Sequence, residues 1–319
     1  LDVYQCSGCG LVQLTNEPVS YYKEVIRAAA FSEEMREFRL KQFEDFVEKY
    51  NLYGKKVLEV GCGKGEYLSL MNESGVEAHG IEYSQESVDY CVSNGLNVSR
   101  KYIESDKDSI QGSPFEAFFI MNFFEHLPDP NAALQGIVNN LTDDGIGLIE
   151  VPNFNMIIQK KLFSEFINDH LFYFTKETLE AALIHNGFEV VECNEIWYDY
   201  IISAVVKKRK KLDISDFQKH QEHVKNEIKQ YVDNFESVAV WGAGHQALAV
   251  IALADLKDKI KYVVDDAPFK QGKYTPATHI PIVPAENLEV SPVEAVIVMA
   301  ASYLPRHPLL RLPQRATAL

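Results

Sequence analysis

The chain has few cysteines and no long apolar run, and both shortages narrow the class of protein. Its 319 residues include five cysteines, an odd number, which favours a reducing compartment over a disulfide framework. No stretch of 18 or more apolar residues occurs, so the sequence predicts no membrane span. A signal-peptide pattern is also missing. Together these absences predict a cytoplasmic protein.

Positive charge is scarce as well. The net charge of -15 argues against general nucleic-acid binding, because such binding depends on neutralising phosphates. The one basic cluster, "KKRKK" at 207–211, is interpreted as a solvated linker edge. With 46% hydrophobic residues, the chain is long enough to form two globular domains.

The stretch "KVLEVGCGKGEYL", which begins at Lys56, has the pattern of a buried strand, a glycine turn and a helix. Gly61, Gly63 and Gly65 allow the backbone to approach a ligand closely. Glu59, just before the turn, would repel a pyrophosphate but attract the ammonium and sulfonium groups of S-adenosylmethionine. The turn therefore favours S-adenosylmethionine over a dinucleotide.

A second acidic residue supports the same cofactor. Glu82 follows Gly61 by 21 residues, at the end of the next predicted strand, where its carboxylate can accept both ribose hydroxyls. Cys62, inside the turn, and Tyr83, directly after Glu82, complete this part of the predicted cofactor site.

Strand-like and helix-like segments alternate from residue 55 onward. This alternation predicts a parallel sheet with helices on both faces. The predicted parallel strands are 56–60, 77–83, 96–103, 116–124 and 145–152. Two further strands, 188–196 and 200–208, have no helix between them and so predict an antiparallel hairpin at one edge, which makes seven strands. A charged helix at 213–235 then leads to a second, smaller α/β unit.

The motifs within residues 55–206 resemble those of class I S-adenosylmethionine-dependent methyltransferases, and "VLEVGCGKG" is the most specific of them. The segment "IMNFFEHLPDP", 120–130, is similar to that family's fourth strand. The resemblance implies that Asn122, Phe123 and His126 belong to the cofactor site. It also implies that Glu125 and His126 open the following helix.

The whole chain further resembles the C-methyltransferases that act on nucleotide-linked keto-deoxysugars. The similarity lies in "CSGCGLVQL" near the start and in residues 262–288. It implies that the acceptor is a small molecule, namely a nucleotide sugar. It also implies that the chain has four parts. These are a partial zinc knuckle (1–20), a methyltransferase domain (21–210), a linker helix (211–235) and a Rossmann-like accessory domain (236–319).

Cys6 and Cys9 have the CxxC spacing of half a zinc site, which needs four ligands. The pair is interpreted as part of a knuckle whose other pair lies upstream of residue 1, with zinc as the expected metal. Two free cysteines in a turn are the alternative.

The family resemblance also implies a catalytic pair, His170 as general base with Asp169 beside it. A histidine, with an ordinary pKa of ~6.5, suits proton removal at neutral pH. The alternative is a structural histidine that anchors its loop. This chain has Asp169 where the family usually has glutamate, and "WYDYIIS" (197–203) where the family has a His-Gly-Gly-Ser stretch.

A second glycine loop, "VWGAGHQA", contains Gly242, Gly244 and Ala247, and Asp265 follows Gly244 by 21 residues. This spacing is a fair dinucleotide fingerprint, so an NAD-dependent oxidoreductase is the rival function. About three strands are expected after this loop, too few for a complete dinucleotide domain. A non-catalytic S-adenosylmethionine-binding protein is the third hypothesis. The methylated atom of the acceptor and the oligomeric state are not indicated by these residues.

Overall fold

The computed structural model describes residues 2–19, 23, 32–299 and 316–318. The chain forms two compact units, Leu1–Lys211 and Leu212–Leu319. None of the helices in the described ranges is long and apolar enough to cross a membrane. Each unit is described separately below.

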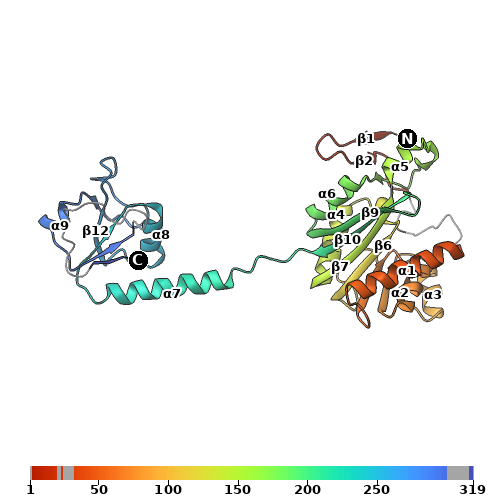
Figure 1. The fold of residues 1–319 in the computed structure, drawn as a ribbon, viewed down its shortest axis with the longest axis horizontal. Helices are drawn as coiled ribbons and strands as arrows, with labels where there is room; N and C mark the ends of the chain where they lie inside the picture. The colour runs from red at the N-terminus through yellow and green to blue at the C-terminus, as the bar shows by residue number, and fades with distance from the viewer. Residues whose placement is uncertain (1, 20–22, 24–31, 300–315, 319) are drawn as a thin grey trace. The chain divides into compact units, whose positions relative to one another are not determined.

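The first unit is built on a seven-stranded sheet with the order β5-β4-β3-β6-β7-β10-β9. Four of these strands, β6, β7, β9 and β10, are labelled in Figure 1. Strands β3 to β7 pair in parallel, and β10 pairs antiparallel with β7 and with β9. The predicted sheet, parallel with a terminal antiparallel hairpin, is confirmed. The strands are β3 Lys56–Val60, β4 Glu77–Glu82, β5 Asn97–Arg100, β6 Phe115–Met121, β7 Leu141–Pro152, β9 Phe188–Ile196 and β10 Ile201–Lys208.

Helices cover both faces of this sheet, as parallel strands require. One core joins the sheet to α1 (Glu33–Lys49), α2 (Glu66–Glu73) and α3 (Gln85–Ser93). The other core joins it to α4 (Pro130–Asn139) and α6 (Lys176–His185). Because β6 is buried on both sides, its sequence "FEAFFIM" is almost continuously apolar.

Several strand ends differ from the prediction by one to four residues, and the differences at β6 and β7 have a visible cause. β6 ends at Met121, three residues before the predicted end, because Asn122 takes a positive φ of 51° and a 3-10 turn follows at Phe124–His126. β7 begins at Leu141 instead of 145, because Leu141 already pairs with the start of β6. Both differences lie in connections, where apolar patterning carries little information.

A small antiparallel sheet lies at the start of the first unit. It contains β1 (Val3–Gln5), β2 (Val12–Leu14) and β8 (Phe172–Tyr173), in that order. The short helices α5 (Phe154–Gln159) and η2 (Phe163–Glu165) precede β8. The N-terminal segment thus pairs with a part of the chain that directly follows residue 170.

The second unit is a parallel sheet with the order β13-β12-β11-β14-β15. Its described residues hold four strands after β11, one more than expected. Ile228 and Val232 place α7, the predicted linker helix, in the core of this unit. The elements are α7 Ser215–Val232, β11 Val238–Trp241, α8 His245–Leu253, β12 Ile260–Val264, β13 Ile282–Val283, α9 Asn287–Val290, β14 Ala295–Val298 and β15 Ala316–Ala318.

Candidate active site

The first glycine loop leaves β3 in a left-handed backbone conformation. Gly61, Gly63 and Gly65 have φ values of 72°, 55° and 80°. A Cβ atom on Gly61 would lie 2.4 Å from the ring of Phe123, and one on Gly65 would lie 2.4 Å from Leu96. Side chains are therefore excluded here by both the backbone conformation and the available space, and the loop offers bare backbone to a ligand.

Glu82 binds the backbone of this glycine loop. Its buried carboxylate accepts hydrogen bonds from the backbone N–H of Gly63 at 3.0 Å and of Ser84 at 2.8 Å. A carboxylate at the end of the second strand is the usual acceptor for the hydroxyls of a ribose. This arrangement fits the cofactor that the sequence predicts.

Four of the predicted cofactor residues, Gly61, Glu82, Tyr83 and Phe123, line one hollow at the carboxyl ends of β3 and β4. Asn122 and His126 follow β6 but do not line it. The hollow is completed by Lys23, Val60, Ile81, Lys101, Tyr102, Ile103, Leu127 and Ala133. Its mixture of aromatic rings and a carboxylate suits a nucleoside.

Glu59 and Cys62 lie behind the loop and not in the hollow. Both side chains are buried. A hydrogen bond with Cys91, burial and the nearby charge of Glu59 all raise the pKa of the Cys62 thiol. The thiol of Cys91 also donates to the carbonyl of Gly63 at 3.5 Å. These residues support the loop from inside the core.

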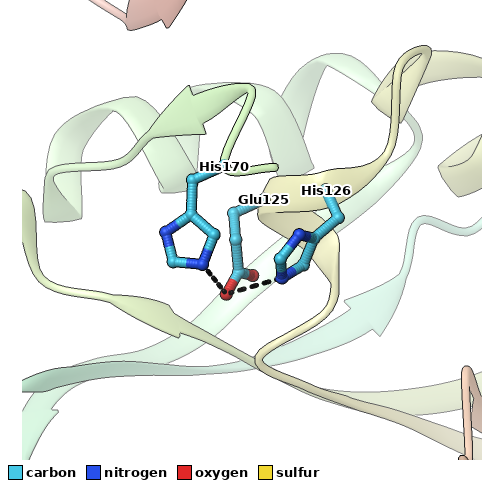
Figure 2. Close-up of side chains that lie close together, drawn as sticks. All are labelled: Glu125, His126 and His170. Atoms are coloured by element: carbon cyan, nitrogen blue, oxygen red, sulfur yellow. Dashed lines mark ion pairs between the residues drawn. The ribbon is translucent and has the colours of Figure 1, made fainter. Parts of the chain in front are cut away.

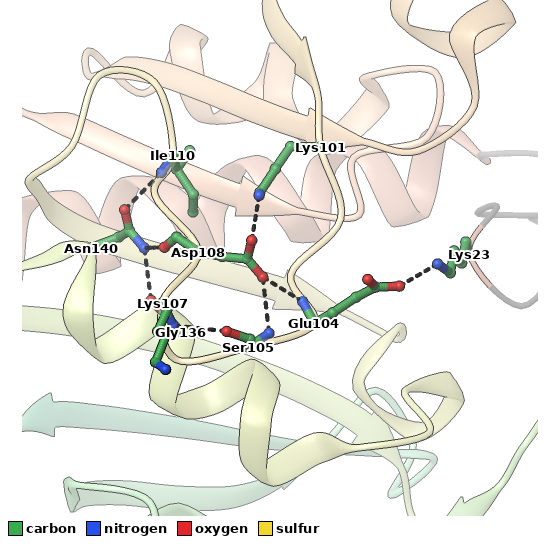
Figure 3. A network of polar contacts seen from close by, with 9 residues as sticks. All are labelled: Lys23, Lys101, Glu104, Ser105, Lys107, Asp108, Ile110, Gly136 and Asn140. Carbon is green, nitrogen blue, oxygen red and sulfur yellow. Dashed lines mark hydrogen bonds and ion pairs between the residues drawn. The ribbon is translucent and has the colours of Figure 1, made fainter.

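A polar network stabilises the loop after β5, which forms one wall of the hollow (Figure 3). The Asp108 carboxylate accepts hydrogen bonds from the backbone N–H groups of Glu104 and Ser105, each at 2.9 Å, and from Lys101 Nζ at 2.5 Å. Asn140 ties the same loop to α4, because its amide donates to the carbonyl of Asp108 at 2.7 Å. The hydrogen bond from Lys101 lowers the pKa of Asp108.

A second group of side chains lies just beyond the carboxyl end of β6 (Figure 2). Glu125 and His126 come from the 3-10 turn after β6, and His170 comes from the loop before β8. Glu125 Oε1 lies 3.9 Å from His126 Nε2 and 4.0 Å from His170 Nε2. The two imidazole rings meet edge to face, with 4.7 Å between their centres. The structure thus brings together two residues of the predicted site and one, Glu125, that was expected only to open a helix.

Burial controls the ionisation of this group. It raises the pKa of the Glu125 carboxyl to about 8. Burial and the neighbouring His126 lower the pKa of His170 to about 4. Burial also lowers the pKa of His126. Without a bound cation, the group therefore favours its uncharged forms at neutral pH.

Asp169 contacts His126 and does not pair with His170. Its backbone carbonyl accepts a hydrogen bond from His126 Nδ1 at 2.8 Å, and its Oδ2 lies 3.9 Å from the same nitrogen. The carboxylate nearest His170 Nε2 belongs to Glu125. The sequence could have indicated Glu125 only through an acidic residue set in the otherwise apolar "FFEHL".

The N-terminal segment holds the loop that carries Asp169 and His170. The backbone N–H of Leu14 donates to the carbonyl of Leu171 at 2.9 Å, and the Asn16 side chain donates to the carbonyl of Asn168 at 3.1 Å. Strand β2 pairs with β8 directly after the histidine.

Cys6 and Cys9 lie exposed in the turn between β1 and β2. Hydrogen bonds from the backbone of Cys9 and Gly8 lower the pKa of Cys6. Among the described residues, no group of three metal-ligating side chains includes this pair. Two thiols supply half of a zinc site, so zinc at this turn stays a prediction.

The second glycine loop closes on its acidic residue in a similar way. The Asp265 carboxylate accepts hydrogen bonds from the backbone N–H of Ala243 at 2.7 Å and of Ala267 at 3.0 Å. The Asp265 carboxylate also binds a cation, Lys270 Nζ, at 2.9 Å. Ala247 is buried on α8.

Comparison with family models gives two matches. Residues 31–193, more than half of the chain, match a methyltransferase domain. Residues 208–305 match a C-methyltransferase C-terminal domain. The chain therefore belongs to the methyltransferase-domain family, and it is a class I enzyme that uses S-adenosylmethionine.

The individual relatives either have low sequence identity to this chain or match only part of it. The C-methyltransferase NovU of Streptomyces niveus is 22% identical over 96% of this chain and 81% of its own length. A ubiquinone biosynthesis O-methyltransferase of Idiomarina loihiensis is 31% identical over 31% of this chain and only 44% of its own length.

Solved structures show some likeness. The PH0226 protein from Pyrococcus horikoshii OT3 aligns with 60% of this chain and 99% of its own, with a TM-score of 0.47 and 17% identity. A SAM-dependent methyltransferase from Aquifex aeolicus aligns with 54% of this chain and 92% of its own, with a TM-score of 0.44 and 18% identity.

Proposed function

We propose that this enzyme transfers the methyl group of S-adenosylmethionine to a carbon atom of a small molecule, a nucleotide-linked ketosugar. The observation that carries the proposal is the segment after β6. Phe123 lines the cofactor hollow, and Glu125 and His126, two and three residues later, lie beside His170 (Figure 2). One short turn therefore joins a cofactor pocket to a cluster of proton-transferring side chains.

Methyl transfer needs this juxtaposition. The reaction is a displacement at the sulfonium methyl, so the enzyme must position the acceptor in line and remove a proton from it. The match of residues 208–305 to a C-methyltransferase C-terminal domain, and the similarity to NovU along most of the chain, support transfer to carbon. The keto group of such an acceptor would acidify the neighbouring carbon.

The roles of single residues belong to the same proposal. The cofactor contacts are assigned to Glu59, Gly61, Cys62, Gly63, Gly65, Glu82, Tyr83, Asn122, Phe123 and His126. Glu59 and Cys62 act from behind the loop. His170, with Asp169, is assigned to the acceptor. A cytoplasmic location is part of the proposal too.

The rival function, NAD-dependent oxidation at the second glycine loop, is less favoured. A dinucleotide ribose would need the Asp265 carboxylate, which already binds Lys270 and two backbone N–H groups. The second unit is better suited to an accessory role.

The test is methyl transfer from labelled S-adenosylmethionine to a panel of nucleotide ketosugars. Each ketosugar is paired with the same sugar carrying a hydroxyl in place of the keto group. We expect a new carbon-bound methyl signal by NMR with a ketosugar, and none with its reduced partner. Methylation of phenols or hydroxyls alone would contradict transfer to carbon. Binding of NAD but not of S-adenosylmethionine, measured by calorimetry, would contradict the cofactor assignment.

His170→Ala tests the acceptor side. We expect turnover to fall roughly 10²–10⁴-fold, the usual contribution of a positioned general base, with S-adenosylmethionine affinity unchanged. His185→Ala is the matched control, because His185 is exposed at the end of α6. A stable His170→Ala protein with near-normal turnover would argue for an anchoring histidine.

A further inference from the structure

Three donor atoms converge in the active site without bonding to one another. Glu125 Oε1, His126 Nε2 and His170 Nε2 all lie within 4.8 Å of one another (Figure 2). The two carboxylate–imidazole distances, 3.9 and 4.0 Å, are too long for hydrogen bonds. Metal–ligand bonds of about 2.0–2.2 Å place neighbouring ligand atoms roughly 3–3.5 Å apart. Small side-chain shifts would therefore close this group around an ion.

The surroundings orient His126 as a ligand. A carbonyl can only accept a hydrogen bond, so the 2.8 Å contact with Asp169 places the proton of His126 on Nδ1. The lone pair of Nε2 then points at Glu125. Metal-binding histidines usually donate their other ring nitrogen to a carbonyl or carboxylate in this way.

Glu125 supplies an independent sign of a missing partner. Its side chain is only 2% exposed, and Oε2 is buried without a hydrogen-bond partner among the described residues. A buried polar atom without a partner is costly, and a cation held by both oxygens of the carboxylate would satisfy it. From this convergence we propose that Glu125, His126 and His170 bind a divalent transition-metal cation, whose open coordination positions take oxygen atoms of the acceptor.

The donor set selects the type of ion. Two imidazoles and one carboxylate suit Zn²⁺, Co²⁺, Fe²⁺ or Mn²⁺ better than Mg²⁺, which prefers oxygen ligands throughout. Three protein ligands leave at least one position open, as in catalytic sites. The acceptor part of this inference rests on the proposed function, whereas metal binding does not. His170 Nε2 is available as the general base of the proposed function when no ion is bound, and it becomes a ligand when the ion binds.

The experiment uses Co²⁺, whose visible absorption reports its ligands. Cys6 and Cys9 could also bind the ion, so all measurements use a chain with Cys6→Ser and Cys9→Ser, stripped with EDTA. We expect one equivalent of Co²⁺ to bind with nitrogen–oxygen coordination bands. His126→Ala and His170→Ala should each lose at least the roughly 10–100-fold in affinity that removal of an outer-shell partner costs. His185→Ala should bind normally.

Further readouts keep the outcome clear if a variant folds poorly. In the parent chain, Co²⁺ or Zn²⁺ should raise the melting temperature, and Mg²⁺ at the same concentration should not. No binding by the folded parent, or equal binding by folded His126→Ala and His170→Ala, would overturn the inference. Normal metal binding without methyl transfer to any ketosugar would count against the proposed function and leave the metal site standing.

Discussion

Arg39 on α1 and Glu150 on β7 form an ion pair in which both side chains are completely buried, with 2.5 Å between Nη1 and Oε2. Gln42 bridges the pair, because its amide oxygen accepts from Arg39 Nη1 at 2.7 Å and its amide nitrogen donates to Glu150. The pair fixes α1 to β7 near the carboxyl ends of the strands, where the active site lies.

Arg39→Met should strongly destabilise the first unit. It leaves the Glu150 charge buried without its partner, which typically costs about 3–5 kcal/mol. Arg36→Met is the control, since Arg36 pairs with Glu73 at 2.7 Å on the surface, where such pairs contribute about 0–1 kcal/mol. Urea unfolding of both variants tests this. Equal losses would show that burial does not decide the contribution of the pair.

Gly61→Ala should abolish detectable S-adenosylmethionine binding. The new methyl group would lie 2.4 Å from the Phe123 ring and would displace the loop or the ring that lines the hollow. Gly54→Ala separates backbone strain from this clash, because Gly54 has a similar φ of 66° and no atom within 4 Å of its Cβ position. Gly54→Ala should lose about 1 kcal/mol of stability and keep its affinity in calorimetry. Unchanged affinity in Gly61→Ala would contradict the cofactor assignment.

Asp265→Asn should weaken the second unit and flatten its acid unfolding. Burial opposes ionisation of Asp265, but Lys270 and two backbone N–H groups outweigh it, so the pKa lies below its ordinary value. A depressed pKa contributes stability above the unfolded-state pKa, and that contribution is lost as the pH falls through the folded-state value. At neutral pH we expect a loss of about 1–3 kcal/mol, typical of hydrogen bonds to a charged group.

Fluorescence can follow this unit alone. The chain has two tryptophans, so Trp197→Phe leaves Trp241 on β11 as the single reporter. In this background, the prediction would be contradicted if Asp265→Asn left the midpoint of acid unfolding unchanged.

Asp199→Gly should stabilise the first unit. Trp197, Tyr198 and Asp199 follow one another with φ of 49°, 59° and 64°, a left-handed run that costs about 1–2 kcal/mol for each non-glycine residue. Part of the gain is offset, because glycine gives the unfolded chain more freedom. We expect about 0.5–1 kcal/mol in thermal unfolding. Glu195→Gly, in the extended strand β9, should destabilise instead. Destabilisation by both would disprove the strain argument.

The sequence predicted the sheet because strands buried on both faces are almost continuously apolar and alternate with helices. The hairpin of β9 and β10 followed from the lack of a helix between them. The sequence could not show that Glu125 lies beside His170, because that contact depends on where a 3-10 turn and a later loop come together in space. The same reason hid the position of Asp169 on His126.

The second loop shows a different limit. Asp265 has dinucleotide spacing, and only the position of Lys270 five residues later shows that its carboxylate is occupied. The segment 197–203 was expected to differ from a His-Gly-Gly-Ser stretch. The sequence did not show that residues 197–199 within it have a left-handed backbone, a conformation that glycine adopts without strain.

The pairing of β2 with β8 has a consequence for the order of folding. The bond between Asn16 and Asn168 joins residues 152 positions apart, whereas neighbouring strands of the large sheet are mostly close in sequence. Closing so long a loop costs conformational entropy before it returns any contact energy, so contacts of this kind form late. The seven-stranded sheet and its glycine loop can thus assemble first. We therefore predict that His170 reaches its final place only when the N-terminal strand joins, so that in refolding catalytic activity appears later than S-adenosylmethionine binding.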